Sequence, residues 1–227
     1  MSDIALHYIE HGQGVPLILL HGNGESHEIF KHQISHFSKE YRIIAIDTRG
    51  HGQSPHGEKP FTIKQFAEDL FDFMNEKSIA KAILLGFSDG GNIALTFALK
   101  HPERVEKLIL NGANLFPNGV KPRYQWPIVI GYHIAKLFSK KSEKAKKNTE
   151  LLGLMVNEPT IHPSELMALH MPVLVIAGKK DMIREKHTYL IYNSLPNAQL
   201  SIIEGNHFIA SQNPAEFNAA VKNFLHS

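Results

Sequence analysis

The sequence predicts an α/β protein with a mostly parallel sheet of about seven strands, helices on both faces and a small helical cap. Three observations predict this fold class. Short apolar runs of strand length alternate with longer segments of helical spacing along most of the chain. One of these strands passes into a helix through a glycine-rich turn at residues 86–91. The alternation breaks once, over residues 113–162, which indicates an inserted segment.

The chain of 227 residues is long enough for one sizeable core and short for two. We therefore expect one core formed by residues 1–112 and 163–227, with the cap inserted at residues 113–162. A hydrophobic fraction of 43% and a charged fraction of 20% are ordinary for a globular protein.

Charge and apolar runs argue against several classes of partner. The formal net charge of +2 is too small to indicate a nucleic-acid partner. The absence of cysteine excludes disulfides, a thiol nucleophile and a zinc–thiolate site. No secretory signal is visible, and the apolar run Val15–Leu20 is far shorter than the roughly 20 residues of a membrane helix. We therefore expect a cytoplasmic protein with no membrane partner.

The first part of the chain indicates a βαβ unit. Residues Ile4–Glu10 alternate as a half-buried strand, and Val15–Leu20 is a buried strand that we expect to pair with it antiparallel. Residues Ser26–Glu40 have helical spacing, and Tyr41–Asp47 is the next buried strand. The expected core face of the helix holds Phe30, Ile34 and Phe37.

Two further strand–helix units follow. Thr62, three residues before Gln65, is typical of a capping box that opens a helix. The strand Ala82–Leu85 leads into the helix that contains Ile93 to Leu99, and His101-Pro102 ends that helix before the strand Val105–Leu110. The expected buried face of the first helix holds Phe66, Leu70 and Phe73 or Met74.

After the cap the strand–helix alternation resumes. The expected elements are a short helix at Pro163–Leu169, strands at Val173–Ala177 and Ala198–Ile203, and helices at Ile183–Leu195 and Asn213–Leu225.

Ser88 lies in the glycine-rich turn, within a Gly-x-Ser-x-Gly pattern. A strand that turns into a helix so abruptly needs residues without a Cβ, which Gly86, Gly90 and Gly91 provide. The turn should hold Ser88 at its tip in a strained backbone conformation. By itself the pattern also fits a glycine-rich turn without a chemical role.

A serine nucleophile needs a histidine base and a third group that orients the base. Asp181 and His207 each come just after a late strand, and the carboxyl ends of parallel strands meet at one edge of the sheet. The chain order is Ser88, Asp181, His207. Glu204 and Asp47 are alternative acids, although both precede the expected loop positions.

An oxyanion hole needs two backbone N–H groups aimed at the developing negative charge. We expect one from Asp89, which directly follows Ser88. The other should come from Asn23, in the loop after the strand Val15–Leu20.

These motifs together resemble the α/β-hydrolase family over nearly the whole chain. The family marks are His21-Gly22, the loop Asp47 to Ser54 in the form D-x-R-G-x-G-x-S, the turn Gly86 to Gly90, the acid Asp181 and the base His207. The resemblance implies an eight-stranded sheet, a cap after the sixth strand and a Ser88-His207-Asp181 triad. The chain departs from it in two ways: the family's first strand is missing, which leaves seven, and the cap is short, which predicts an open pocket.

The serine at position 88 also indicates the reaction, because relatives that attack carbon, the dehalogenases and epoxide hydrolases, carry aspartate there. The resemblance therefore implies acyl transfer to water, with a small-molecule carboxylic ester as substrate. Two alternatives remain open. One keeps the triad in another reaction, as in carbon–carbon bond hydrolases, lactonases, peptidases, perhydrolases or lyases. The other is a non-catalytic sensor of a small ligand.

The Asp89 side chain has two interpretations: it binds a cationic group of the substrate, or it favours the N-terminus of its helix. An apolar pocket under the cap is also expected. Its candidate lining residues are Phe87, Phe116, Trp126 and Phe208, together with Tyr124, Tyr132 and Phe138.

No metal or cofactor is expected. Glu28, His32 and His36 have helical spacing but lie opposite the expected core face, so a solvated stripe is the better interpretation. Gly22-x-Gly24 imitates a dinucleotide-binding loop, but His27 stands where its third glycine belongs. The lysines of residues 140–147 are interpreted as a solvated face of the cap. A homodimer is compatible with the sequence.

Overall fold

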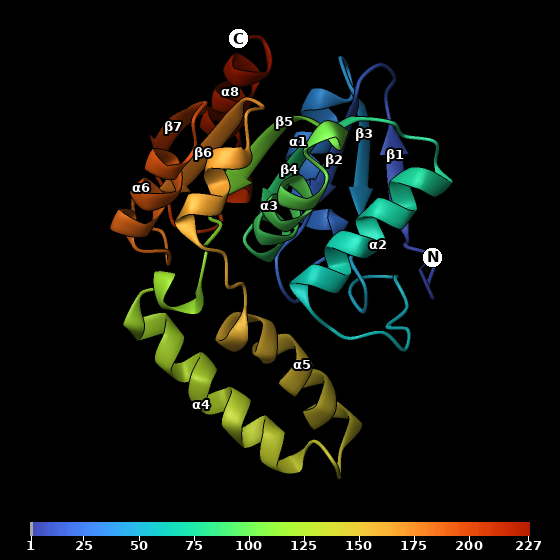
Figure 1. The fold of residues 1–227 in the computed structure, drawn as a ribbon, viewed down its shortest axis with the longest axis vertical. Helices are drawn as coiled ribbons and strands as arrows, with labels where there is room; N and C mark the ends of the chain where they lie inside the picture. The colour runs from blue at the N-terminus through green and yellow to red at the C-terminus, as the bar shows by residue number, and fades with distance from the viewer. Residues whose placement is uncertain (1) are drawn as a thin grey trace.

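The computed structural model describes residues 2–227 and contains one seven-stranded sheet (Figure 1). The strand order is β1-β3-β2-β4-β5-β6-β7, and every pair of neighbours is parallel except β1 and β3. The predicted fold class is therefore confirmed. The strands are β1 (Tyr8–His11), β2 (Pro16–Leu20), β3 (Arg42–Ile46), β4 (Ala82–Phe87), β5 (Val105–Asn111), β6 (Val173–Gly178) and β7 (Ala198–Ile203).

The expected pairing of the first two strands is wrong. Strand β1 pairs antiparallel with β3, in the register Tyr8 to Ile46, and does not pair with β2. Strand β2 instead lies between β3 and β4, where its residues Leu17–Leu20 are buried. A continuously apolar strand is stabilised by two neighbours and two covered faces, whereas the half-exposed β1 suits the edge of a sheet.

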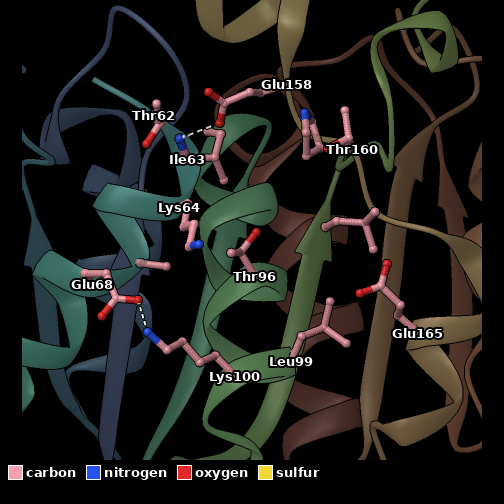
Figure 2. A pocket seen from close by; sticks show the side chains of 13 residues that line it. Thr62, Ile63, Lys64, Glu68, Thr96, Leu99, Lys100, Glu158, Thr160 and Glu165 are labelled. Carbon is pink, nitrogen blue, oxygen red and sulfur yellow. Dashed lines mark hydrogen bonds and ion pairs between the residues drawn. The ribbon is translucent and has the colours of Figure 1, made fainter. Parts of the chain in front are cut away.

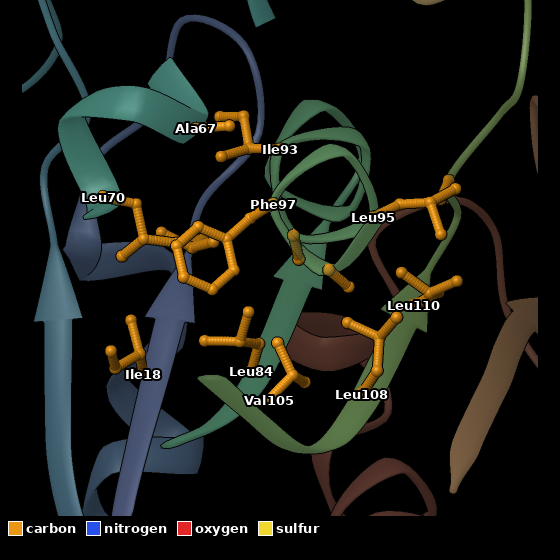
Figure 3. Close-up of a cluster of buried hydrophobic side chains, with 14 of the residues drawn as sticks. Ile18, Ala67, Leu70, Leu84, Ile93, Leu95, Phe97, Val105, Leu108 and Leu110 are labelled. Carbon is orange, nitrogen blue, oxygen red and sulfur yellow. The ribbon is translucent and has the colours of Figure 1, made fainter. Parts of the chain in front are cut away.

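Helices cover both faces of the sheet and enclose two clusters of buried side chains. On one face, α2 (Ile63–Glu76) and α3 (Asp89–Lys100) pack on Ile18, Leu84 and neighbouring side chains (Figure 3). On the same face, α6 (Glu185–Ser194) packs on β6 and β7. On the other face, α1 (Lys31–Phe37), α7 (Ile209–Gln212) and α8 (Pro214–Leu225) pack on the buried cluster that contains Leu17 and Leu85. Each fully buried large apolar side chain contributes about 1.5 to 3 kcal/mol to this packing.

Several helices are shorter than the sequence predicts. The segment expected as one helix at Ser26–Glu40 is a 3-10 turn at His27–Phe30 followed by α1, and the helix expected at Pro163–Leu169 is a 3-10 helix at Pro163–Ala168. Two more 3-10 turns lie at Pro102–Arg104 and Pro117–Gly119. The short helix α7 was not expected, because four residues carry no measurable period. Thr62 does cap α2, by accepting a hydrogen bond from the Gln65 N–H at 3.1 Å.

The cap is a helical hairpin that projects from the core at the carboxyl end of the parallel strands (Figure 1). It consists of α4 (Pro122–Phe138) and α5 (Glu143–Asn157), both within the predicted insertion. Helix α5 is tied to the core at its middle and just after its C-terminal end. Glu150 pairs with His56 at 3.0 Å, and the Ile63 N–H donates to the Glu158 carboxylate at 2.8 Å. None of the helices within residues 2–227 has the length and apolar character needed to cross a membrane.

Asp47 organises the loop after β3. Its carboxylate accepts hydrogen bonds from the backbone N–H groups of His27 (2.8 Å) and Gln53 (3.0 Å), and the side chains of His7 and His27 lie 2.8 Å from it. Burial alone would raise the pKa of Asp47, but these hydrogen bonds lower it to about 2. The charged carboxylate therefore stabilises the folded chain.

We predict that Asp47→Asn lowers the free energy of unfolding at pH 7 by about 2 to 3 kcal/mol, because hydrogen bonds to a buried charge are lost. The loss should shrink as the pH falls from 4 towards about 2, the pKa of the folded form, because the wild-type carboxylate is then protonated as well. Urea unfolding measures both effects. Glu204→Gln, at an exposed carboxylate paired with Lys179, is the control and should change little. An Asp47→Asn protein as stable as the wild type at pH 7 would contradict this role.

Candidate active site

The turn between β4 and α3 has the predicted strain. Ser88 is one of two non-glycine residues within residues 2–227 with positive φ (φ 53°, ψ −119°). The surrounding backbone is packed closely enough to hold it there: a Cβ at Gly90 would collide with the carbonyl oxygen of Leu20, and one at Gly86 with that of Gly90. The Ser88 N–H donates to the Asn111 carbonyl oxygen at 2.8 Å. The serine hydroxyl is therefore held at the carboxyl edge of the sheet.

Three side chains from separate loops meet in one hydrogen-bonded chain. His207 Nε2 lies 3.0 Å from Ser88 Oγ, and His207 Nδ1 lies 2.7 Å from Asp181 Oδ1. His207 and Asp181 are both buried. Asp181 is fixed in turn by the Ile183 N–H, which donates to Oδ1 at 2.8 Å. This geometry lets a histidine take a proton from the serine while the aspartate holds its ring.

The alternative acids lie elsewhere. The Glu204 side chain is 64% exposed and pairs with Lys179, and Asp47 contacts His7 and His27. Asp181 is thus the carboxylate that contacts His207.

Gly112, at the end of β5, makes room for the histidine, and sequence reasoning did not identify it. A Cβ at this position would lie 2.7 Å from His207 Cε1 and 2.9 Å from its Nδ1. The residue also has a φ of +63°, which disfavours side chains other than hydrogen. Its signal in the sequence is a glycine directly after a buried strand, a pattern too common to be specific.

The neutral side chain of His21 positions the loop after β2, which carries Asn23. Burial lowers the pKa of His21 to about 4. Its Nδ1 lies 2.7 Å from the Gly22 carbonyl oxygen, and its Nε2 accepts the Thr48 N–H at 3.0 Å. These contacts join the loop after β2 to the loop after β3. Among residues 2–227, neither the Asn23 nor the Asp89 backbone N–H donates a hydrogen bond, so both remain available to an oxyanion.

Glu25 is a second group near the site that the sequence did not reveal. Its carboxylate accepts the Gly22 N–H at 3.1 Å. Burial raises the pKa of Glu25 to about 7, although the Gly22 N–H and the nearby His207 lower it. The loop that carries Asn23 is therefore fixed from inside by an acid that titrates near neutral pH.

The cap contacts this loop directly. The Asn23 side-chain amide donates to the carbonyl oxygen of Leu151 on α5, at 2.7 Å. The Lys121 ammonium, just before α4, donates to the carbonyl oxygen of Asp181. The hairpin thus touches both the oxyanion loop and the acid loop.

Asp89 carries a buried carboxylate beside the serine. Asn92 donates to its Oδ1 at 3.2 Å, whereas Oδ2 has no hydrogen-bond partner among the described residues. Burial raises the pKa of Asp89 to about 6, against the effect of the Asn23 and Asn92 side-chain amides. A buried carboxylate oxygen without a hydrogen-bond partner is costly to the folded chain.

The four aromatic candidates separate into two pairs. Phe87 and Phe208 lie against His207, with ring centroids 4.9 Å and 5.7 Å away. Phe116 instead packs on His187, and Trp126 is 65% exposed on α4. The first pair is next to His207 and the second is not.

A hollow of about 590 Å³ lies between α2, α3 and the segment that returns from the cap (Figure 2). Glu158, Thr62 and Thr96 line it, and Glu68 pairs with Lys100 at its edge. Burial raises the pKa of Glu158, and its charge in turn raises that of Asp89. Ser88 is not among the lining residues, so this hollow is distinct from the triad.

The structure also brings together three side chains of metal-ligand type that the sequence did not connect: His7, His27 and Asp47, whose ligand atoms lie within 4.8 Å of one another. Both histidines are within hydrogen-bond distance of Asp47, which itself accepts two backbone N–H groups. We interpret this cluster as the anchor of its loop.

A strained elbow serine, a histidine and a buried aspartate at the carboxyl edge of a parallel sheet are the arrangement of a serine hydrolase. The family comparison agrees: the model of the alpha/beta hydrolase fold matches residues 15–132, more than half of the chain. The chain belongs to the alpha/beta hydrolase fold family.

Relatives within the family cover nearly the whole chain. The human protein named "Serine hydrolase BPHL" is 27% identical, over 99% of this chain and 84% of its own length. The "3-oxoadipate enol-lactonase 2" of Acinetobacter baylyi is 25% identical, over 97% of this chain and 93% of its own. The enol-lactonase structure from Burkholderia xenovorans LB400 superposes with a TM-score of 0.83 at 20% identity, over 99% and 97% of the two chains, which shows a shared fold.

We predict that Gly112→Ala displaces His207 and reduces kcat by roughly 100-fold, with a smaller effect on KM, because a misplaced base affects the chemical step. Steady-state kinetics on an activated ester measures this. Gly14→Ala is the matched control, since Gly14 also has positive φ (+101°) but lies near Glu40, away from the triad. Equal losses of activity in the two variants would mean that backbone strain alone, and no contact with His207, limits position 112.

Proposed function

We propose that this protein is a serine hydrolase that cleaves small carboxylic esters through an acyl-enzyme. The observation that carries the proposal is the continuous chain from Ser88 Oγ through His207 to Asp181, with separations of 3.0 Å and 2.7 Å. The family supplies the class of reaction, hydrolysis. The proposal adds the bond that is cleaved and the residues that cleave it.

In the proposed mechanism, Ser88 Oγ attacks the ester carbonyl carbon as His207 Nε2 takes its proton. Asp181 stabilises the resulting imidazolium, and the Asn23 and Asp89 backbone N–H groups bind the oxyanion. His207 then protonates the departing alcohol. A water molecule, deprotonated by His207, attacks the acyl group and releases the acid, which restores the serine.

A lactonase is the alternative with a specific observation in its favour, because the Acinetobacter relative carries that name. A lactone is a cyclic ester, so the same residues would act and the acid and alcohol would remain in one product. Activity on p-nitrophenyl esters of rising chain length, compared with activity on simple lactones, separates the two. Ligand-dependent melting without turnover of either class would favour the sensor.

We further propose that the Asp89 carboxylate selects substrates with a cationic group near the scissile bond. Its Oδ2 is buried and without a hydrogen-bond partner among the described residues, one residue from the nucleophile. A favourable interaction with the N-terminus of α3 does not explain this buried carboxylate. Burial raises its pKa, so its charged form is unfavourable to folding. A substrate ammonium group would supply both the hydrogen bond and the countercharge.

We predict that Ser88→Ala reduces kcat/KM for p-nitrophenyl esters by at least about 10⁴-fold and abolishes labelling by a fluorophosphonate probe. His207→Gln should behave similarly. Ser26→Ala, at the N-cap of the 3-10 turn before α1, is a control that should retain labelling. Ester turnover that survives in Ser88→Ala would overturn the mechanism.

Two esters are compared, one with an ammonium group in its acyl chain and one that is its neutral isostere. We predict that Asp89→Asn lowers the ratio of their kcat/KM values by roughly 10- to 100-fold, because about one charge-assisted hydrogen bond is lost. The wild-type preference should fall as the pH drops below about 6, where the carboxylate is protonated.

The same substitution should raise the melting temperature at pH 8. A raised acid pKa means that the folded chain binds more protons than the unfolded chain between 3.8 and about 6, so wild-type stability falls as the pH rises across that range. Removing the charge removes this penalty. A wild-type enzyme with equal activity on the two esters would refute the selectivity while leaving the Ser88 mechanism intact.

A further inference from the structure

Helix α4 exposes an apolar face where a surface helix normally exposes a polar one. We call this face the cap stripe; it consists of Trp126, Ile130, Ile134, Leu137 and Phe138, each between 54% and 76% exposed. These positions are spaced by three or four residues or adjoin at the end of the helix, so they cover one side of it. Half of the ten large exposed apolar side chains within residues 2–227 lie in this stripe.

The opposite side of α4 faces α5. Ala135 is buried there, and the Gln125 side-chain amide donates to the Met155 carbonyl oxygen at 3.1 Å. The stripe is therefore not needed to hold the hairpin together. A contiguous exposed apolar face of this kind marks an interaction surface.

A cluster of lysines surrounds the tip of the hairpin, next to the stripe. Residues 136–147 contain six lysines, Lys136, Lys140, Lys141, Lys144, Lys146 and Lys147, and one acidic residue, Glu143. All six lysines are exposed. The chain as a whole has a net charge of only +2, so this concentration of positive charge is local to the cap.

We propose that the cap stripe and the lysine cluster dock on the surface of an anionic lipid bilayer. Aromatic and aliphatic side chains along one helix face, flanked by lysines, are the features of a helix that lies in the bilayer interface. The absence of a spanning helix in the described part of the chain fits attachment to the surface. The sequence alone predicted no membrane partner, because it did not show that these apolar residues are exposed.

A second copy of the chain is the other candidate occupant, and the charges disfavour it. In a symmetric contact between two stripes, each lysine cluster would lie beside the other cluster or, with antiparallel helices, beside Lys121 and Arg123 of the second copy. Glu143 is the one acidic residue in either segment, so positive charges would face each other. An anionic surface provides the complementary charge.

The single tryptophan of the chain makes the proposal directly measurable, because Trp126 belongs to the stripe and is 65% exposed. The experiment uses the Ser88→Ala full-length protein, so that lipid hydrolysis cannot interfere. Binding is measured by tryptophan fluorescence and by flotation with phosphatidylcholine vesicles, with and without 30% phosphatidylglycerol. We expect a blue shift, and quenching by brominated acyl chains, only with the anionic vesicles. Binding should weaken as salt is added.

The variants separate the apolar from the electrostatic contribution. Leu137→Glu should lower the vesicle partition coefficient at least tenfold, and Ile130→Glu provides a second test of the same face. Met167→Glu is the matched control, because Met167 is 67% exposed but lies outside the cap, and it should change nothing. Lys140→Gln, Lys144→Gln and Lys147→Gln should each cost roughly fivefold, whereas Lys31→Gln should not.

Three results would overturn the proposal: fluorescence that does not respond to anionic vesicles, equal binding by Leu137→Glu and the parent, or a concentration-dependent blue shift without lipid that coincides with dimer formation in light scattering. The last would assign the stripe to a second copy. None of these results bears on the triad, which the Ser88→Ala kinetics test separately.

Discussion

The close approach of α3 to the sheet at Gly86 and Gly90 is the constraint on which the site depends. A side chain at either glycine would collide with a neighbouring backbone carbonyl, so the helix begins directly against the ends of β2 and β4. This contact forces Ser88 into positive φ, and the large apolar clusters on both faces of the sheet provide the free energy that maintains the strain. The core therefore holds Ser88 in place, together with the hydrogen bond from its N–H to the Asn111 carbonyl oxygen.

The protein buries two kinds of charged side chain, those with enough hydrogen-bond partners and those with too few. The Asp47 carboxylate accepts hydrogen bonds from backbone N–H groups and contacts two histidines. The Arg49 guanidinium is also satisfied, because it donates to the Asp69 carboxylate at 2.7 Å. These charges fix the loop after β3. Asp89 and Glu25 are different, because burial raises the pKa of each and their partners compensate for it only in part. Two of the unfavourable charges thus lie near Ser88 and His207, whereas the favourable ones stabilise the loop after β3.

The cap connects the site to the outer surface. One side of the hairpin reaches the oxyanion loop through Asn23 and Leu151, and the other side carries the exposed cap stripe. Helix α5 is tied to the core by two polar contacts, one at Glu150 in its middle and one at Glu158 just after its C-terminal end. The stripe therefore lies one helical layer from the loop that carries Asn23.

The sequence by itself determined the sheet-forming runs, the elbow at Ser88 and the candidates Asp181 and His207, because hydrophobic period and turn glycines are local properties. The tertiary structure decided what depends on neighbours distant in the chain. It placed β1 beside β3, because β2 is enclosed by β3 and β4. It separated Asp181 from the other acids, made Gly112 part of the histidine's environment and exposed one face of α4. Contacts between segments that are distant in the chain leave no period in the sequence, so only the folded chain could show them.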